Sequence, residues 1–241
     1  MMDALNRHDR IALQVSGGRD SLACLHLMRP YWGRLTVYWC NTGAAFPETV
    51  AIMEQVRALV PHFVEVNGNQ PDVIASFGLP SDIVPASNTP IGIMGGDSAG
   101  PVIQDRYSCC AQVFMLPLHA RMVADGITLI VRGQKNADKL KAPIRSGMVD
   151  LGIEYLFPIE DWSNRQVMDF LAAEGAPIPR FYEMMSGAPD CMTCSAYWET
   201  GTAAYLKRYH HPQYLEVQRR LDIINAAIGP SIANFNQEVN T

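Results

Sequence analysis

Short apolar runs alternate with segments of helical spacing in the first part of the chain. Residues 11–15 (IALQV), 35–40 (LTVYWC) and 62–66 (HFVEV) have the length and apolar content of buried strands. Between them, residues 20–28 and 47–59 place apolar side chains at helical spacing, and a proline opens the second of these segments. Because strands that alternate with helices connect by right-handed crossovers, this order predicts an α/β fold with a mostly parallel, twisted sheet and helices on both faces.

The pattern weakens in the middle of the chain and returns towards its end. Residues 67–107 are rich in Gly, Pro, Ser and Asp, and residues 91–100 (IGIMGGDSAG) are expected to form a mobile loop, a candidate lid. Regular elements are predicted beyond this region as a helix over 109–126, a strand over 127–133, a short strand from Tyr155, a helix N-capped by Ser163 and an amphipathic helix over 212–228. The pair His210-His211 is expected to mark a helix boundary.

The length fits one compact domain. With 241 residues the chain can bury well over half of its unfolded surface in a single core, and it contains no internal repeat. We therefore expect one domain over residues 1–241, with a core over 11–198 and a small C-terminal helical extension over 199–241. No run approaches the ~20 apolar residues that cross a bilayer, and the first residues are polar, so a cytoplasmic protein without signal peptide or membrane span is expected.

The charge balance argues against a general affinity for nucleic acid. The formal net charge is −5 and the pI is about 5.6, whereas salt-driven binding to nucleic acid requires a basic face. A local basic stretch follows the strand predicted over residues 127–133. It contains Arg132, Lys135, Lys139, Lys141 and Arg145. Its position at the edge of the expected ligand crevice favours binding of phosphate or sulfate, although solvation of a loop explains it too.

Residues 16–21 (SGGRDS) lie where the first strand gives way to the first helix. At such a point the free backbone N–H groups and the positive helix end favour a phosphate. The glycines allow a close approach, Ser16 and Ser21 can add hydroxyl donors, and Arg19 adds a charge. The segment is neither a Walker loop nor a GxGxxG fingerprint. An ordinary tight connection between strand and helix is the alternative interpretation.

Four of the six cysteines are arranged as metal ligands. Cys191 and Cys194 form a Cys-x-x-Cys, whose spacing suits a metal site or a redox pair, and clustered cysteines in a reducing compartment are more often ligands than disulfides. Cys109 and Cys110 are adjacent, and a disulfide between neighbours is strained, so they suit a site with several metal atoms. A four-iron cluster matches these four thiolates better than one zinc does. Two cysteines are instead predicted to be core residues: Cys24 and Cys40.

Several motifs resemble those of one superfamily. SGGRDS resembles the SGGxDS motif of the N-type ATP pyrophosphatase (PP-loop) superfamily. Residues 39–49 (WCNTGAAFPET), 131–143 (VRGQKNADKLKAP) and 157–194 resemble successive segments of the phosphoadenylyl-sulfate (PAPS) reductase family. Cys-Cys followed about eighty residues later by Cys-x-x-Cys resembles the 4Fe–4S motif of the adenylyl-sulfate (APS) reductase branch of that family. The resemblance runs from about residue 11 to residue 198.

This resemblance implies an adenine nucleotide alpha hydrolase-like fold and an enzyme that binds ATP, APS or PAPS. The expected catalytic residues are Asp20 and Lys135. The expected nucleotide-binding residues are Ser16, Gly17, Gly18, Arg19, Asp20, Ser21, Asn41, Thr42, Gly43, Arg132, Gly133, Lys139 and Lys141. The expected ligands of a 4Fe–4S cluster are Cys109, Cys110, Cys191 and Cys194.

Departures from the family pattern bear on the reaction. Asn41 stands where the family has Asp, and Gln134 and Lys135 stand where arginines are typical. Reductases of the family attack sulfur with a cysteine in a C-terminal Glu-Cys-Gly-Leu/Ile-His segment, and no cysteine follows Cys194 in this sequence. The leading hypothesis is therefore ATP-dependent adenylation coupled to sulfur transfer, with Mg²⁺ offsetting phosphate charge.

Two other functions stay open. One is an APS or PAPS reductase served by a thioredoxin-like reductant, with its nucleophile elsewhere or on a partner. The other is a non-catalytic nucleotide-binding iron–sulfur subunit. The adenylating enzyme would need a sulfur donor and an acceptor, and the net charge does not support a nucleic-acid acceptor. A homo-oligomer is compatible with the sequence.

Overall fold

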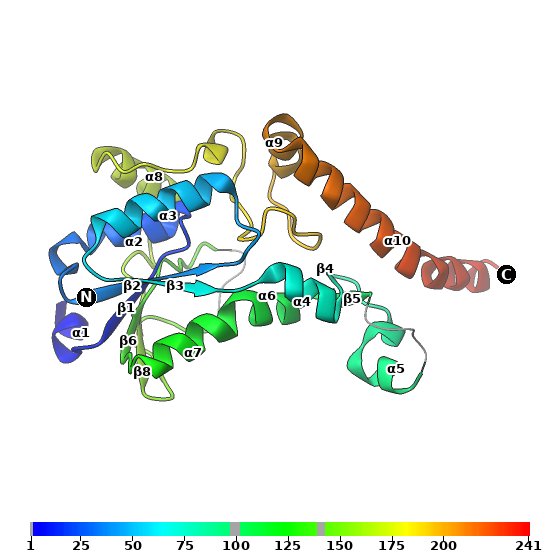
Figure 1. The fold of residues 1–241 in the computed structure, drawn as a ribbon, viewed down its shortest axis with the longest axis horizontal. Coiled ribbons are helices and arrows are strands. Elements are labelled where there is room, and N and C mark those ends of the chain that lie inside the picture. The colour runs from blue at the N-terminus through cyan, green and yellow to red at the C-terminus, as the bar shows by residue number, and fades with distance from the viewer. Residues whose placement is uncertain (1, 97–101, 139–142) are drawn as a thin grey trace. The chain divides into compact units, whose positions relative to one another are not determined.

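The structure is a computed structural model that describes residues 2–96, 102–138 and 143–241. The chain divides into two compact units, whose elements are labelled in Figure 1. Unit 1 comprises Met1–Asn41, Ala45–Asn67 and Pro117–Tyr182. Unit 2 comprises Thr42–Ala44, Gly68–Leu116 and Glu183–Thr241, so residues 199–241 lie within it.

A six-stranded sheet forms the centre of unit 1. In spatial order its strands are β3 (Phe63–Asn67), β2 (Leu35–Asn41), β1 (Ile11–Gln14), β6 (Leu129–Val131), β8 (Ile153–Leu156) and β7 (Val149–Asp150). Only β7 runs antiparallel to its neighbour among these strands, which confirms the predicted mostly parallel sheet. From β1 the chain proceeds to β2 and β3 on one side and to β6 and β8 on the other. The crevice outside β1 and β6 is thus the switch point at which such sheets bind ligands.

Helices cover both faces of this sheet, as predicted (Figure 1). Those of unit 1 are α1 (Met2–Arg7), α2 (Arg19–Leu27), α3 (Pro47–Leu59), α7 (Leu116–Ala124, in unit 1 from its second residue) and α8 (Asn164–Ala173), with 3₁₀ turns at Arg29–Tyr31 and Arg180–Glu183. Side chains alternate along β1. Ile11 and Leu13 pack in a cluster with α2, α3 and α8, whereas Ala12 packs in a second cluster with Met122 of α7.

The helix starts of unit 1 follow from local sequence. Pro47 occupies the first turn of α3, where its missing N–H costs no hydrogen bond. Ser163 caps α8: its hydroxyl accepts from the backbone N–H of Gln166, whose side chain bonds back to the Ser163 N–H. The predicted N-cap is therefore confirmed as a full capping box.

Unit 2 is mainly helical with one pair of short parallel strands. Its elements are α4 (Gln70–Phe77), β4 (Leu79–Ser81), a 3₁₀ turn (Ala86–Asn88), α5 (Pro90–Met94), β5 (Ile103–Asp105), α6 (Arg106–Cys110), a π-helical turn (Ala111–Met115), α9 (Thr202–Tyr209) and α10 (His211–Val239). Leu79 and Ile103 of the strand pair pack against Ile224 and Ile228 of α10. Together these residues form one apolar core of the unit.

The structure differs from the predicted elements mainly in unit 2. The weakly patterned region 67–107 contains α4, β4, α5 and β5, so residues 91–94 of the predicted loop are helical, and residues 97–100 of that loop lie outside the described residues. The helix predicted over 109–126 is divided by the π-helical turn. The final helix extends to Val239 rather than ending at residue 228, and His210 separates α9 from α10 as predicted.

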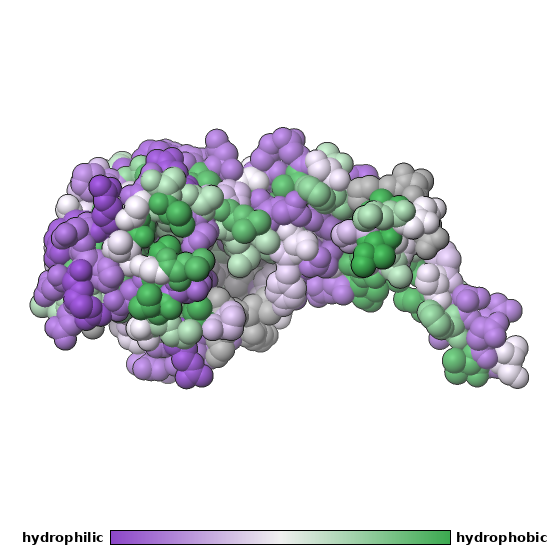
Figure 2. Space-filling model, turned by 90° about the horizontal axis from the view of Figure 1, so that it is seen from below, coloured by the Kyte–Doolittle hydropathy of each residue, from purple (hydrophilic) through white to green (hydrophobic). Residues whose placement is uncertain are grey.

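The surface mixes polar and apolar residues. Figure 2 shows hydrophobic groups (green) interspersed with hydrophilic ones (purple) on the face that it presents. Across the described part of the chain, no helix combines the length and apolarity required to span a bilayer.

Candidate functional site

The segment Ser16–Ser21, here called the phosphate loop, joins β1 to α2. Gly17 has φ +80°, and a Cβ at this position would lie 2.9 Å from Thr49 Cγ2, so glycine is required there. The Ser21 hydroxyl accepts from the Ser16 N–H at 3.1 Å and donates to the Gly18 carbonyl at 2.8 Å. Gly18, the N-cap of α2, provides no side-chain cap, which leaves the helix end suited to an anion.

The basic loop after β6 meets the phosphate loop through a buried lysine. Lys135 Nζ lies 2.6 Å from Asp20 Oδ1 and 2.9 Å from Asp138 Oδ1, and its side chain is 0% exposed. The Lys135 backbone N–H donates to Asp138 Oδ2 at 2.8 Å, so Asp138 binds both ends of this lysine. The close approach of the loops requires Gly133, because a Cβ there would lie 2.7 Å from the Asp20 carbonyl.

Asp20 and Lys135, the predicted catalytic pair, are thus brought together, and Asp138 is a partner that the sequence reasoning missed. The Lys135–Asp20 contact is an ion pair whose angles do not meet those of a hydrogen bond. Arg132 lies on the same loop, with its guanidinium 6.0 Å from the ring centre of Phe157. The other two predicted contacts from this loop, Lys139 and Lys141, lie outside the described residues.

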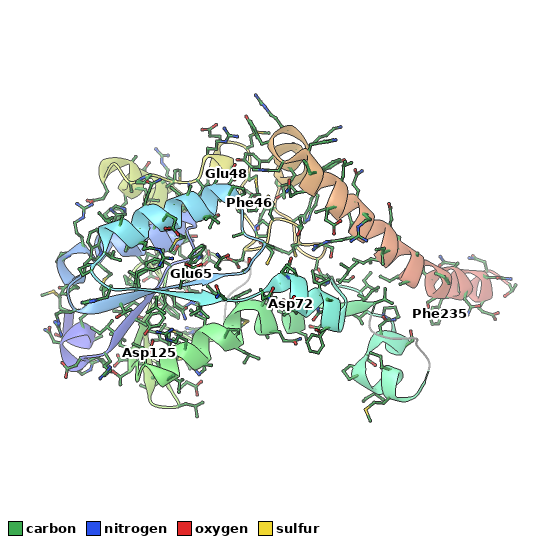
Figure 3. All side chains as sticks on the ribbon, viewed as in Figure 1. Phe46, Glu48, Glu65, Asp72, Asp125 and Phe235 are labelled. Carbon is green, nitrogen blue, oxygen red and sulfur yellow. The ribbon has the colours of Figure 1, made fainter. Side chains whose placement is uncertain are left out.

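Asn41 ends β2 at the same edge of the sheet. Its side-chain amide donates to Glu65 Oε1 of β3 at 2.9 Å, and the Glu65 carboxylate also pairs with Arg57 of α3. Figure 3 labels Glu65 on β3. A neutral amide at position 41 therefore suits its carboxylate neighbour, which the sequence alone did not indicate.

The next residues along the chain, Thr42–Ala44, belong to unit 2. Thr42 and Ala44 contact the Cys-x-x-Cys region, whereas Gly43 lies near Asn69 and Pro71. The buried Thr42 hydroxyl donates to the Asp190 carbonyl at 3.3 Å and also hydrogen-bonds the Cys191 side chain. The Met192 N–H donates to the Ala44 carbonyl at 2.7 Å. Of the predicted nucleotide contacts, Thr42 is thus bonded to the cysteine region.

All four clustered cysteines lie in unit 2 and interact electrostatically. Cys109 interacts with Cys194 and Cys110, and Cys191 interacts with Cys109 and Cys194. Burial raises the pKa of the Cys109 thiol to about 11 and that of Cys110 to about 12, and it raises the pKa values of Cys191 and Cys194 as well. Within the described ranges, no three His, Cys, Asp or Glu side chains are grouped as ligands of a metal ion.

Two arginines lie near the cysteines and were not found from the sequence. Arg106, in the first turn of α6, and Arg220, on α10, both favour the thiolate of Cys194 electrostatically. Arg220 Nη1 donates to the carbonyl of Thr193 at 2.7 Å, and its Nε donates to Glu216 at 2.7 Å. No sequence spacing relates Arg220 to the Cys-x-x-Cys, so only the fold could show this contact.

The two remaining cysteines are placed differently. Cys24 on α2 is fully buried in the core of unit 1, and this burial raises its pKa. Cys40 on β2 is half-buried. The core position predicted for Cys24 is confirmed.

Comparisons with known proteins identify a matching domain and a relative. Residues 10–78 match the sequence model of the phosphoadenosine phosphosulfate reductase domain. Adenosine 5'-phosphosulfate reductase of Allochromatium vinosum is 20% identical over 188 residues, which cover 78% of this chain and 68% of that protein.

Two solved structures are similar to this chain. Phosphoadenylyl-sulfate (PAPS) reductase from Candida auris, in a phosphate complex, superposes with a TM-score of 0.53 at 13% identity, covering 76% of this chain and 81% of that chain. U34-tRNA thiolase NcsA from Methanococcus maripaludis, with its [4Fe-4S] cluster, gives a TM-score of 0.45 at 11% identity, covering 90% of this chain and 72% of that chain. The first shows a shared fold. The match over residues 10–78 confirms, for that part of the chain, the resemblance to the phosphoadenosine phosphosulfate reductase family that was predicted from the sequence.

Proposed function

We propose that the phosphate loop binds the phosphates of ATP and that the protein adenylates an oxygen of an acceptor, which sulfur then replaces. The observation that carries this proposal is the N-terminus of α2 at the switch point of the sheet, where its N-cap Gly18 offers no side-chain cap and where backbone N–H groups and Arg19 favour an anion. The buried Lys135 neutralises Asp20 at the same place. A carboxylate in a phosphate site would otherwise repel the ligand.

The proposed reaction has two displacements. An oxygen of the acceptor attacks the α-phosphorus of ATP, the bond to the β-phosphate oxygen breaks, and pyrophosphate leaves with the negative charge. A sulfur nucleophile then attacks the acceptor carbon, and AMP leaves with the activated oxygen. Loop N–H groups and Arg19 would stabilise the charge on the leaving pyrophosphate, and Mg²⁺ would offset the remaining phosphate charge.

The cysteine quartet fits an iron–sulfur cluster by the chemistry of its donors. Four thiols from two segments interact with one another, and Arg106 and Arg220 favour the charged forms of Cys109, Cys110 and Cys194 against the larger effect of burial, which raises the pKa of each thiol. Four cysteine thiolates are the usual ligand set of a four-iron cluster. The described residues contain no group of three His, Cys, Asp or Glu side chains around one metal ion. Cys109, Cys110, Cys191 and Cys194 would hold this cluster, which when bound would supply the sulfur chemistry.

A second candidate is an adenylyl-sulfate reductase, which the curated relative from Allochromatium vinosum favours. In this case the loop would hold the phosphate of the substrate, and a thioredoxin-like protein would serve as reductant. A nucleic-acid acceptor for the first candidate is not favoured by the net charge of −5.

One assay distinguishes these functions. Anaerobically purified protein is incubated with Mg²⁺-ATP and candidate acceptors, and in parallel with APS or PAPS plus reduced thioredoxin. Release of pyrophosphate supports adenylation, and release of sulfite supports the reductase. Nucleotide binding without either product contradicts both and supports a non-catalytic subunit. The variant R19Q should weaken either activity, because it removes a positive charge from the loop.

A further inference from the structure

Tyr182 lies directly on the phosphate loop although it is distant in sequence. The backbone N–H of Arg19 donates to the Tyr182 hydroxyl at 3.1 Å. The Arg19 guanidinium carbon lies 5.2 Å from the centre of the Tyr182 ring, within the range of a cation–π contact. A Cβ on Gly18 would lie 3.2 Å from the same hydroxyl. One tyrosine thus contacts both the main chain and the side chain of the only arginine in the loop.

The fold holds Tyr182 in this position. Its ring centre lies 4.8 Å from that of Phe181, which is 1% exposed, and Phe181 in turn packs at 5.3 Å against Phe46, just before α3. On the other side of this 3₁₀ turn, Arg180 pairs with Glu48 of α3 at 3.9 Å. Figure 3 labels Phe46 and Glu48 at this end of α3. The tyrosine is therefore supported by buried aromatic packing rather than by the loop itself.

From this geometry we infer that Tyr182 is a positioning residue for Arg19 in phosphate binding. This rests on the proposed function, in which the phosphate loop binds the nucleotide phosphates. An arginine side chain loses rotamer freedom when it orders on a ligand, and this entropy loss opposes binding. Stacking on the Tyr182 ring restricts the guanidinium before the ligand arrives, so less of this cost remains for binding. The hydroxyl keeps the Arg19 N–H oriented in the loop.

The test measures affinity for inorganic pyrophosphate and for ATP by titration calorimetry. We expect Y182L to bind pyrophosphate roughly tenfold more weakly than wild type, within the range of a cation–π contact. Y182F keeps the ring and should stay within about threefold of wild type. In the R19Q background, Y182L should cause no further loss, because Tyr182 acts through Arg19.

Control variants separate this role from general packing. Tyr209 also carries an arginine over its ring, with the Arg208 guanidinium 5.0 Å from the ring centre, so Y209L is a matched change away from the loop and should bind as wild type does. If Y182L does not fold, as judged by thermal unfolding, Y182M fills the volume without a ring and serves in its place.

Three results would overturn the inference: wild-type affinity in the ring-free variant, a loss in Y182F as large as in Y182L, or an equal loss from Y182L with and without Arg19. Wild-type protein that fails to bind either ligand would refute the proposed function together with the inference. Wild-type binding with an unaffected Y182L would refute the inference alone.

Discussion

Replacing Lys135 with methionine removes the one buried charge from a group of three. In the native structure its ammonium is 0% exposed and pairs with Asp20 and Asp138, whose side chains are 30% and 27% exposed. Methionine has a side chain of similar length but leaves the two carboxylates beside each other without a cation. Breaking a fully buried pair costs about 3–5 kcal/mol, and because water reaches both carboxylates here we expect a smaller loss of ~2 kcal/mol. For a chain of this size that corresponds to a drop in Tm of roughly 4–8 °C.

The same substitution should weaken nucleotide binding. An uncompensated Asp20 carboxylate beside the phosphate loop repels the ligand, and a loss of about tenfold in affinity corresponds to ~1.4 kcal/mol. Differential scanning calorimetry measures the first effect, and titration with pyrophosphate measures the second. The double variant D20N/K135M is the control, since it removes one stranded charge and should regain part of the Tm and part of the affinity. A double variant as unstable and as weakly binding as K135M would refute the electrostatic explanation.

Three other outcomes are expected. Anaerobic preparations should show broad absorbance near about 400 nm together with iron and acid-labile sulfide. The variant C191S should lose the absorbance, the iron and the sulfide, whereas the control C24S should keep them. A colourless wild-type protein that contains one zinc would contradict the cluster. Hydrogen bonds from Arg219 and Arg220 hold the pKa of Glu216 at about 2, against an ordinary 4.5. The ionised Glu216 therefore stabilises the fold above pH 4.5, and this stabilisation disappears as the pH falls towards 2. The Tm of E216Q should fall less than that of wild type over this interval, and parallel curves of Tm against pH for the two proteins would contradict the prediction. S163A should lower Tm by roughly 2–4 °C through loss of ~1 kcal/mol of capping energy, whereas the exposed change D169N should not.

The elements of unit 1 could be predicted because their signals are local. Strands β1 and β2 are apolar runs buried by helices on both faces, Pro47 opens α3, and Ser163 caps α8. The phosphate loop could be predicted for the same reason: the strand, the glycines and the helix that form it are contiguous in sequence.

The strands of unit 2 could not be predicted because their stability depends on distant partners. Leu79 and Ile103 lie in strands of three residues, too short to show a period of two, and they are buried by Ile224 and Ile228 of α10. The site residues that the sequence reasoning missed also depend on contacts with distant segments. Tyr182 and Asp138 contact the phosphate loop and the lysine beside it, yet neither lies in a motif that points to that contact.

The contacts of Asn41 explain why an amide suits this position. The resemblance noted in the sequence implies a carboxylate here. In the structure Asn41 donates to Glu65, which lies on the neighbouring strand and pairs with Arg57. An aspartate at position 41 would face this carboxylate at hydrogen-bonding distance, where like charges oppose each other. A carboxylate is thus retained at this edge of the sheet, one strand away from where the pattern predicts it, and Asn41 is the residue type that can bind to it.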